Sequence, residues 1–270
     1  MIFVSVRPPN LVRPNWVWCV TGHPARRQCG APFFARFPTL LDSRWLRQFN
    51  ARVPLDKLTI IGAGLLGGSI GLAARARGLA RRVSALVRRP ESLAECQALG
   101  IANEVTLDPA EAVAGADLVV LCTPISGMAG LAKRTLPDLK PGTVITDVGS
   151  TKQQLVAELT PLCAGAGARF VGSHPMAGSD QTGPSAARAD LFDGTVCVVT
   201  PTSDTDADAL ATVNDFWAGL GSRPVVMPAD THDRLVAPCR TCWPRPWPGA
   251  CSTPRTASSR RSFARPVFAT

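Results

Sequence analysis

The hydrophobic pattern between residues 55 and 149 alternates short apolar runs with longer segments in which apolar residues recur at helical spacing. The apolar runs predict buried strands at 58–61, 82–87, 104–106, 117–122 and 143–148. The intervening segments predict helices, among them 91–99, 109–114 and one for which Ser126 can serve as N-cap. Because a parallel sheet wound by helices requires this alternation, the sequence predicts an α/β fold.

The stretch Leu58–Ser69, LTIIGAGLLGGS, joins a predicted strand to a predicted helix through a glycine-rich turn. Gly62 permits a tight turn, Gly64 leaves room for a pyrophosphate at the helix N-terminus, and Gly67 lets the helix pack close to the strand. We therefore predict a Rossmann-type, doubly wound dinucleotide-binding fold; the alternative is a glycine-rich turn without a ligand. The predicted cofactor-binding residues of the turn are Gly62, Gly64, Leu65, Leu66 and Gly67.

Two arginines after the second predicted strand bear on the choice of cofactor. A carboxylate at this place would bind the ribose 2′-hydroxyl of NAD, whereas arginine accommodates the 2′-phosphate of NADP. Arg88 and Arg89 follow Val87, and no acid occurs before Glu91. Since a planar guanidinium pairs well with phosphate, we expect NADP. NAD is the alternative if the arginines form a solvated turn.

Polar residues also follow the fourth and fifth predicted strands. Ligands of open α/β sheets bind at the carboxyl ends of the strands, which places Thr123, Pro124 and Ser150 where a nicotinamide should lie. Simpler alternatives exist, because Thr-Pro commonly ends a strand, and Ser150 or Thr151 could cap a helix starting at Lys152.

His174 is the strongest candidate for chemistry in the second half of the chain. It follows a strand predicted over Arg169–Gly172 and lies in a predicted loop bounded by glycine and proline. We predict a catalytic role for it; the alternative is a surface histidine without a function. His232 and Asp233 open a helix that we expect to fail before Pro238. We expect them to be capping or packing groups; the alternative is a role in the site. The other predicted elements are helices at 185–191 and 206–220 and strands at 196–200 and 224–227.

The net charge of +9 is carried by the two ends of the chain. Residues 1–54 hold eight Arg and one Asp, giving +7, and residues 238–270 hold six Arg and no acid, giving +6. The middle, 55–237, holds 15 Lys and Arg against 19 Asp and Glu, giving −4. Because the basic charge lies outside this mildly acidic middle, a nucleic-acid partner is not expected.

Both ends differ in composition from the middle. We interpret 1–54 as a disordered extension or translated upstream sequence, with Val53 as a possible GTG start. Residues 238–270 are rich in Pro, Arg, Cys and Trp and show neither a helical nor a strand period. This composition is what GC-rich DNA encodes when it is translated out of frame. A shift of two bases from Pro238 gives codons compatible with Leu-Pro-His and an apolar helix. We therefore expect a dinucleotide-binding domain at 55–228, the start of a helical domain at 229–237, and an unstructured tail.

The cysteines and the hydropathy favour a cytoplasmic protein. The four cysteines of the middle lack metal-ligand spacing and are expected to be reduced core thiols: Cys96, Cys122, Cys163 and Cys197. Cys239 and Cys242 form a CxxC pair without a second pair, so we expect no metal site. No apolar run reaches the roughly 18 residues that a membrane span needs, and we expect no membrane association.

Five segments together resemble the prephenate/arogenate dehydrogenase family. They are GAGLLGGSIGLA from Gly62, DVGSTK at Asp147–Lys152, GSHPMAGSDQTG at Gly172–Gly183, ADLFDG at Ala189–Gly194 and HDRLVA from His232. The resemblance covers about residues 55–237, and its DVGSTK and SHPMAG elements are more specific than the glycine turn. It implies oxidative decarboxylation of prephenate to 4-hydroxyphenylpyruvate, or of arogenate to tyrosine, with hydride transfer to NAD(P) in tyrosine biosynthesis.

The resemblance also implies roles for particular residues. His174 would hold and accept the hydroxyl proton of the substrate, and Ser150 would hydrogen-bond the same hydroxyl at the nicotinamide edge. The family's all-helical C-terminal domain, which builds a homodimer and supplies a substrate-binding Arg, does not match the printed tail. This leaves dimerisation and activity open. The alternatives are a β-hydroxyacid or imine dehydrogenase, and a non-catalytic nucleotide-binding relic.

Overall fold

The computed structural model describes residues 54–241 of the chain, and the predictions for 1–53 and 242–270 lie outside the described residues. Nine strands are assigned within this part: β1 Leu55–Ile61, β2 Ala80–Leu86, β3 Glu104–Thr106, β4 Leu118–Leu121, β5 Val144–Asp147, β6 Arg169–Phe170, β7 Gly172–Pro175, β8 Val196–Thr200 and β9 Arg223–Val226. The helices are α2 Leu65–Ala76, α3 Pro90–Ala98, α4 Pro109–Val113, α5 Ile125–Thr135, α6 Gln153–Ala164, α7 Ala207–Gly219 and α8 Ala229–Thr241.

Six strands form one parallel sheet in the order β3-β2-β1-β4-β5-β6. The order reverses between β1 and β4, and it is the strand order of the dinucleotide-binding fold that the sequence predicts. Ile61, the last residue of β1, pairs with Leu86 on one side and Leu121 on the other. The carboxyl ends of β1, β2 and β4 therefore meet at one edge of the sheet.

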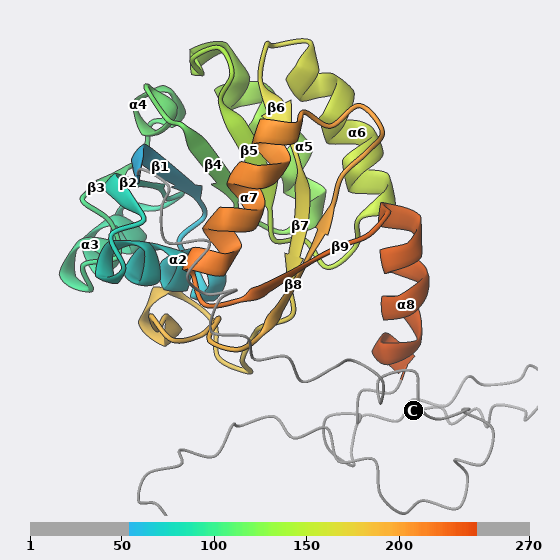
Figure 1. The fold of residues 1–270 in the computed structure, drawn as a ribbon. Helices are drawn as coiled ribbons and strands as arrows, with labels where there is room; N and C mark the ends of the chain where they lie inside the picture. Colours follow the sequence, from blue (N-terminus) through green and yellow to red (C-terminus); the bar gives the residue numbers. More distant parts are fainter. Residues whose placement is uncertain (1–53, 242–270) are drawn as a thin grey trace, which may run out of the picture. The chain divides into compact units, whose positions relative to one another are not determined.

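Alternate residues of the central strands face two separate cores. Leu58 and Ile60 of β1 belong to a cluster with α2 and α7, whereas Ile61 belongs to a cluster with α5 and α6. Figure 1 shows α7 in front of the sheet and α5 behind it. Because side chains alternate along a strand, a continuous apolar run such as Leu118–Leu121 covers both faces of the sheet.

The second half of the chain adds a smaller sheet, which the sequence did not predict as a separate unit. It has the order β7-β8-β9, with β7 antiparallel and β9 parallel to β8. The predicted strand over Arg169–Gly172 is divided, because β6 pairs with β5 while β7 pairs with β8. Strand β7 of this second sheet contains the start of the SHPMAG segment and lies next to β5 (Figure 1).

Three further predictions are wrong in detail. The helix expected over 185–191 is a short 3-10 turn, Pro184–Ala186, followed by turns, because Arg188 donates its N–H to Ser69 Oγ at 3.0 Å and this contact fixes the segment on α2. Ser126 does not cap α5, which already begins at Ile125 after Pro124. The helix expected to stop before Pro238 continues to Thr241 as α8.

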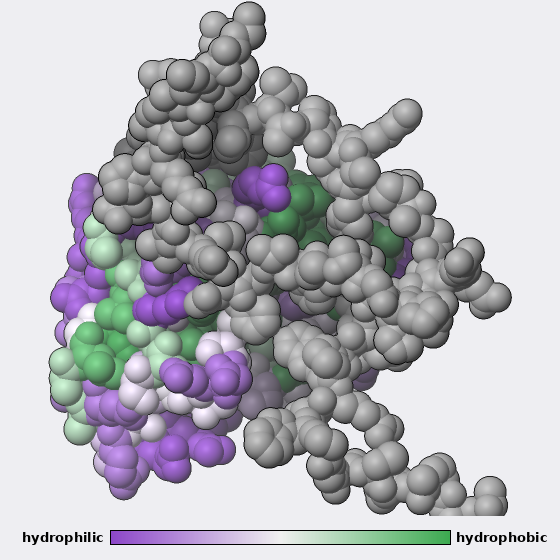
Figure 2. All heavy atoms as spheres, turned by 90° about the horizontal axis from the view of Figure 1, so that it is seen from below, coloured by the Kyte–Doolittle hydropathy of each residue, from purple (hydrophilic) through white to green (hydrophobic). Residues whose placement is uncertain are grey.

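The described surface mixes charged and apolar side chains. Figure 2 shows green and purple side chains interspersed over the part of this face that the described residues form. The most exposed large hydrophobic residues come from different elements and loops: Leu99, Leu107, Met176, Val225, Val226 and Leu235. No helix among residues 54–241 is long and apolar enough to cross a membrane.

Candidate functional site

The glycine turn has the packing that the sequence predicts. Gly62 has φ +98°, a conformation that disfavours other residues, and a Cβ on Gly67 would lie 2.0 Å from the Gly62 carbonyl oxygen. A Cβ on Gly64 would meet nothing within 4 Å. Leu65 and Leu66 form the first turn of α2, and neither an acidic residue nor a side-chain cap occupies this helix N-terminus. The backbone N–H groups there suit an anion.

Thr123 and Pro124 lie beside this turn. The methyl group of Thr123 would be 2.9 Å from a Cβ on Gly62, so the ends of β1 and β4 are in direct contact. Thr123 Oγ1 is buried and has no hydrogen-bond partner among the described residues. Pro124, at the N-cap of α5, is exposed. An unpartnered hydroxyl at the strand crossover is a polar group that a ligand could satisfy.

Arg88 and Arg89 follow β2 at the same edge of the sheet. Both side chains are exposed, and Arg89 is the N-cap residue of α3. Val87 donates its N–H to the Thr106 carbonyl at 3.0 Å, which fixes the backbone just before the arginines. The ion pairs among residues 54–241 include neither guanidinium.

Ser150 lies in the turn between β5 and α6. Its side chain is exposed, while Asp147 and Lys152 on either side of the turn are fully buried. Neither Ser150 nor Thr151 caps α6. The helix begins at Gln153, one residue later than expected, and its cap comes from a distant part of the chain.

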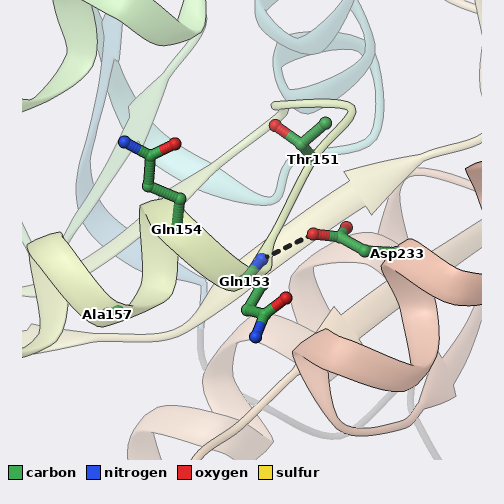
Figure 3. A pocket seen from close by; sticks show the side chains of 5 residues that line it. All are labelled: Thr151, Gln153, Gln154, Ala157 and Asp233. Carbon is green, nitrogen blue, oxygen red and sulfur yellow. Dashed lines mark hydrogen bonds between the residues drawn. The ribbon is translucent and has the colours of Figure 1, made fainter.

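That cap is the carboxylate of Asp233 in α8. Its Oδ1 accepts the N–H of Lys152 at 2.8 Å, and its Oδ2 accepts the N–H of Gln153 at 2.9 Å. Figure 3 shows the second contact, with Thr151 and Gln154 lining the same shallow pocket. Burial would raise the pKa of Asp233, but the hydrogen bonds from Gln153, Lys152 and His232 lower it below its ordinary value. The carboxylate is therefore ionised near neutral pH.

His174 lies in β7 and not in the loop that the sequence predicts. Its backbone pairs with Val198 of β8, so the glycine and proline around it mark the ends of a short strand. The imidazole is half-buried. Its Nδ1 lies 2.8 Å from Nε2 of His232, with the rings edge to face at 76° and their centroids 5.1 Å apart.

His232 joins His174 to Asp233. It is fully buried, and its Nδ1 lies 2.7 Å from Oδ1 of Asp233. We refer to His174, His232 and Asp233 as the histidine relay. The two residues were predicted to be capping or packing groups. Asp233 is a capping group, although of α6 and not of its own helix, and His232 is fully buried. The direct contact of His232 with His174 was not predicted.

When the rings of His174 and His232 are both neutral, their contacts fix which nitrogen of each ring carries the hydrogen. An ionised carboxylate can only accept, so His232 carries its hydrogen on Nδ1 and offers a lone pair on Nε2. His174 then donates from Nδ1, and its Nε2 carries the lone pair. Such an arrangement can orient His174 as a proton acceptor and can stabilise an imidazolium at this position.

A buried polar network lies behind His174. The ammonium of Lys152 pairs with the Asp147 carboxylate and donates to the Ser173 carbonyl at 2.8 Å. Ser173 Oγ also accepts from Trp217 Nε1 at 2.9 Å. Burial lowers the pKa of Lys152, although Asp147 acts in the opposite direction. Neither Asp147 nor Lys152 was assigned a role in the site from the sequence, because their burial depends on the packing of β5 against β7.

No group of three or more His, Cys, Asp and Glu side chains within the described ranges could hold a metal ion. The four cysteines that the structure describes are free thiols: Cys96, Cys122, Cys163 and Cys197. Burial raises the pKa of Cys96 to about 11 and that of Cys163 to about 12. These two thiols are therefore protonated and unreactive near neutral pH.

Comparison with known proteins gives a consistent family. The model of the prephenate dehydrogenase nucleotide-binding domain matches residues 70–226. A cyclohexadienyl dehydrogenase of Zymomonas mobilis is 35% identical over 180 residues, which cover 67% of this chain and 61% of that protein.

Two solved structures extend the comparison. Prephenate dehydrogenase from Aquifex aeolicus, in complex with hydroxyphenyl propionate and NAD+, is 29% identical with a TM-score of 0.64, over 68% of this chain and 64% of that one. Arogenate dehydrogenase from Synechocystis is 29% identical with a TM-score of 0.63, over 67% and 63%. The chain thus spans less than two thirds of the length of each relative.

Proposed function

The chain belongs to the prephenate dehydrogenase family, and from this premise we propose that it oxidises and decarboxylates prephenate or arogenate with a nicotinamide dinucleotide as hydride acceptor. The observation that carries the proposal is the contact of His174 Nδ1 with His232 Nε2, with Asp233 behind it. This geometry supports a role for His174 as a base at the carboxyl edge of the sheet, where folds of this type bind their ligands.

Three observations support binding of the dinucleotide. Space at Gly64 leaves room for a pyrophosphate, the uncapped N-terminus of α2 suits its charge, and the buried Thr123 hydroxyl lacks a partner among the described residues. Leu65, Leu66 and Gly67 would contribute backbone N–H groups. When bound, the nicotinamide supplies the hydride acceptor.

We favour NADP over NAD because of the end of β2. Arg88 and Arg89 are exposed cations beside the glycine turn, and no carboxylate stands where one would bind a ribose 2′-hydroxyl. NAD remains the alternative cofactor, since the Aquifex aeolicus relative has NAD+ bound.

The proposed role of His174 is to hold a proton. Its Nε2 accepts the hydroxyl proton of the substrate as the hydride leaves the ring carbon that bears this hydroxyl. The positive charge that forms is stabilised through His232 by the ionised Asp233. Carbon dioxide then leaves, the ring becomes aromatic, and the proton returns to the oxygen. Ser150 hydrogen-bonds the same hydroxyl and orients it.

The test is an assay with prephenate and with arogenate in separate reactions, each with NADP and NAD, following reduction of the nicotinamide by absorbance. We expect turnover that falls by about 10² to 10⁴ in His174→Ala. Lys140→Met is the control, because Lys140 is paired with Asp117 at the opposite edge of the sheet. Turnover that survives in His174→Ala would contradict the assignment. Dinucleotide binding without turnover of either substrate would identify a non-catalytic nucleotide-binding protein.

A further inference from the structure

Lys152 contacts Asp233, at one end of the histidine relay, and Ser173, the residue next to the other end. Its backbone N–H donates to Asp233 Oδ1 at 2.8 Å, and its ammonium donates to the carbonyl of Ser173, the residue before His174, at 2.8 Å. Together with the contacts through His232, these bonds form a closed ring: from His174 through His232 and Asp233 to Lys152, and back through Ser173.

The ammonium of Lys152 is directed away from solvent. The side chains of Lys152 and Asp147 are both fully buried and paired with each other. The carboxylate of Asp147 also accepts two backbone hydrogen bonds, from the N–H of Gly149 at 2.7 Å and from the N–H of Ser173 at 3.1 Å. Since all these partners belong to the protein, the pair joins the turn after β5 to strand β7.

Stability alone does not explain this pair. A buried ion pair is often no more stabilising than apolar side chains of similar size, because both ions must leave water. Ser173 is also held independently, since its hydroxyl donates to the Asp147 carbonyl at 2.6 Å and accepts from Trp217. The contribution specific to Lys152 is to tie β7 to the cap of α6, and thus His174 to Asp233.

We propose that Lys152 is a positioning residue of the active site, which fixes the orientation of the His174 ring by holding Ser173 and Asp233 at once. The inference rests on the proposed function for its catalytic consequence. Its structural part, the geometry of the relay, stands without turnover.

The first test measures the tautomers of the relay histidines by NMR. The chain has three histidines, so ¹⁵N-imidazole NMR of the full chain gives few signals, which His174→Gln and His232→Gln assign. In the unmodified chain at neutral pH we expect both relay histidines to be protonated at Nδ1. In Lys152→Met we expect the His174 signals to shift toward the mixture of tautomers that a free imidazole shows. Lys140→Met, which removes a lysine paired with Asp117 on the far edge of the sheet, should leave both histidines unchanged.

A second variant keeps the test decisive if Lys152→Met does not fold. Asp147→Asn combined with Lys152→Met removes both buried charges, so no uncompensated ion remains. We expect this variant to fold, to retain dinucleotide affinity within about 2-fold, and to lose about 10²-fold in kcat, the size of effect that a misplaced catalytic group produces. A folded double variant with the wild-type tautomers and kcat would overturn the proposal. A changed NMR pattern in a chain that never turns over would support the positioning role and contradict the proposed function instead.

Discussion

His174 Nδ1 and His232 Nε2 lie 2.8 Å apart although 58 positions separate the two residues in the sequence. One belongs to a short strand and the other to α8, so the contact depends on the docking of two elements from different parts of the chain. Because the ionised Asp233 accepts a hydrogen bond from Nδ1 of His232, Nε2 of His232 is the acceptor and Nδ1 of His174 is the donor in this pair.

Replacing His232 should therefore weaken the base without removing it. We expect His232→Leu to lower kcat by about 10²-fold, within the range for general base catalysis, because His174 loses its acceptor. His232→Gln places an amide near the position of Nε2 and should lose less. Steady-state kinetics with prephenate and the dinucleotide gives both values. Equal losses in the two variants would mean that packing, and not the hydrogen bond, is what His232 provides.

Asp233 should contribute stability that depends on pH. Its folded pKa is lowered, so the contribution is fully present above the unfolded value of about 3.9 and is lost as the pH falls through the folded value. We expect Asp233→Asn to lower the free energy of unfolding by about 1 kcal/mol at pH 7, as loss of a helix cap does. The difference from wild type should shrink in urea titrations below pH 4. Asp190→Asn, at an exposed pair with Arg188, is the control.

Two glycines of the turn should separate folding from binding. A Cβ on Gly67 would lie 2.0 Å from a backbone oxygen, so we expect Gly67→Ala to unfold at lower temperature or to fail to fold. A Cβ on Gly64 meets nothing within 4 Å, and its φ of −80° is ordinary for alanine. Gly64→Ala should keep the wild-type Tm but lose dinucleotide affinity. The idea fails if Gly64→Ala binds as tightly as wild type.

The arginines after β2 should discriminate between the two cofactors. We expect Arg88→Ala combined with Arg89→Ala to weaken NADP binding by roughly 10- to 100-fold, the worth of a lost hydrogen bond to a charged group. NAD binding should change little. The matched control is Arg81→Ala with Arg82→Ala, at the opposite end of the same strand and also exposed. Fluorescence titration with each dinucleotide provides the comparison, and equal losses for NADP and NAD would refute the assignment.

The sequence predicts the parallel sheet well because its signals are local. The central strands contain apolar runs that are visible in the sequence itself, as at Leu118–Leu121, whereas the short edge strand β6 was predicted with the wrong end. The dinucleotide turn is equally local, since the three glycines act within six residues. The cofactor-binding residues remain predictions, but their positions at one edge of the sheet follow from the parallel topology.

The rest of the candidate site depends on contacts that no local pattern records. His174 was placed in a loop because glycine and proline flank it, yet pairing with β8 makes the segment a strand. The helix expected near Ala187 is prevented by its contact with α2, where a Cβ on Gly68 would lie 2.7 Å from Ala187 Cβ. Lys152 would look like an exposed lysine in any sequence window. Its burial becomes visible only when β5, β7 and α8 are assembled.

The position of His232 in the chain sets an order of events during synthesis. All six strands of the parallel sheet lie before residue 171. During synthesis the complete sheet can therefore emerge from the ribosome before α8 has been translated. His174 then exists without its partner until 58 further residues have emerged. The hydrogen-bond partner that orients the His174 ring is therefore made last, together with the cap of α6, because the neighbouring residues His232 and Asp233 of α8 supply the two contacts.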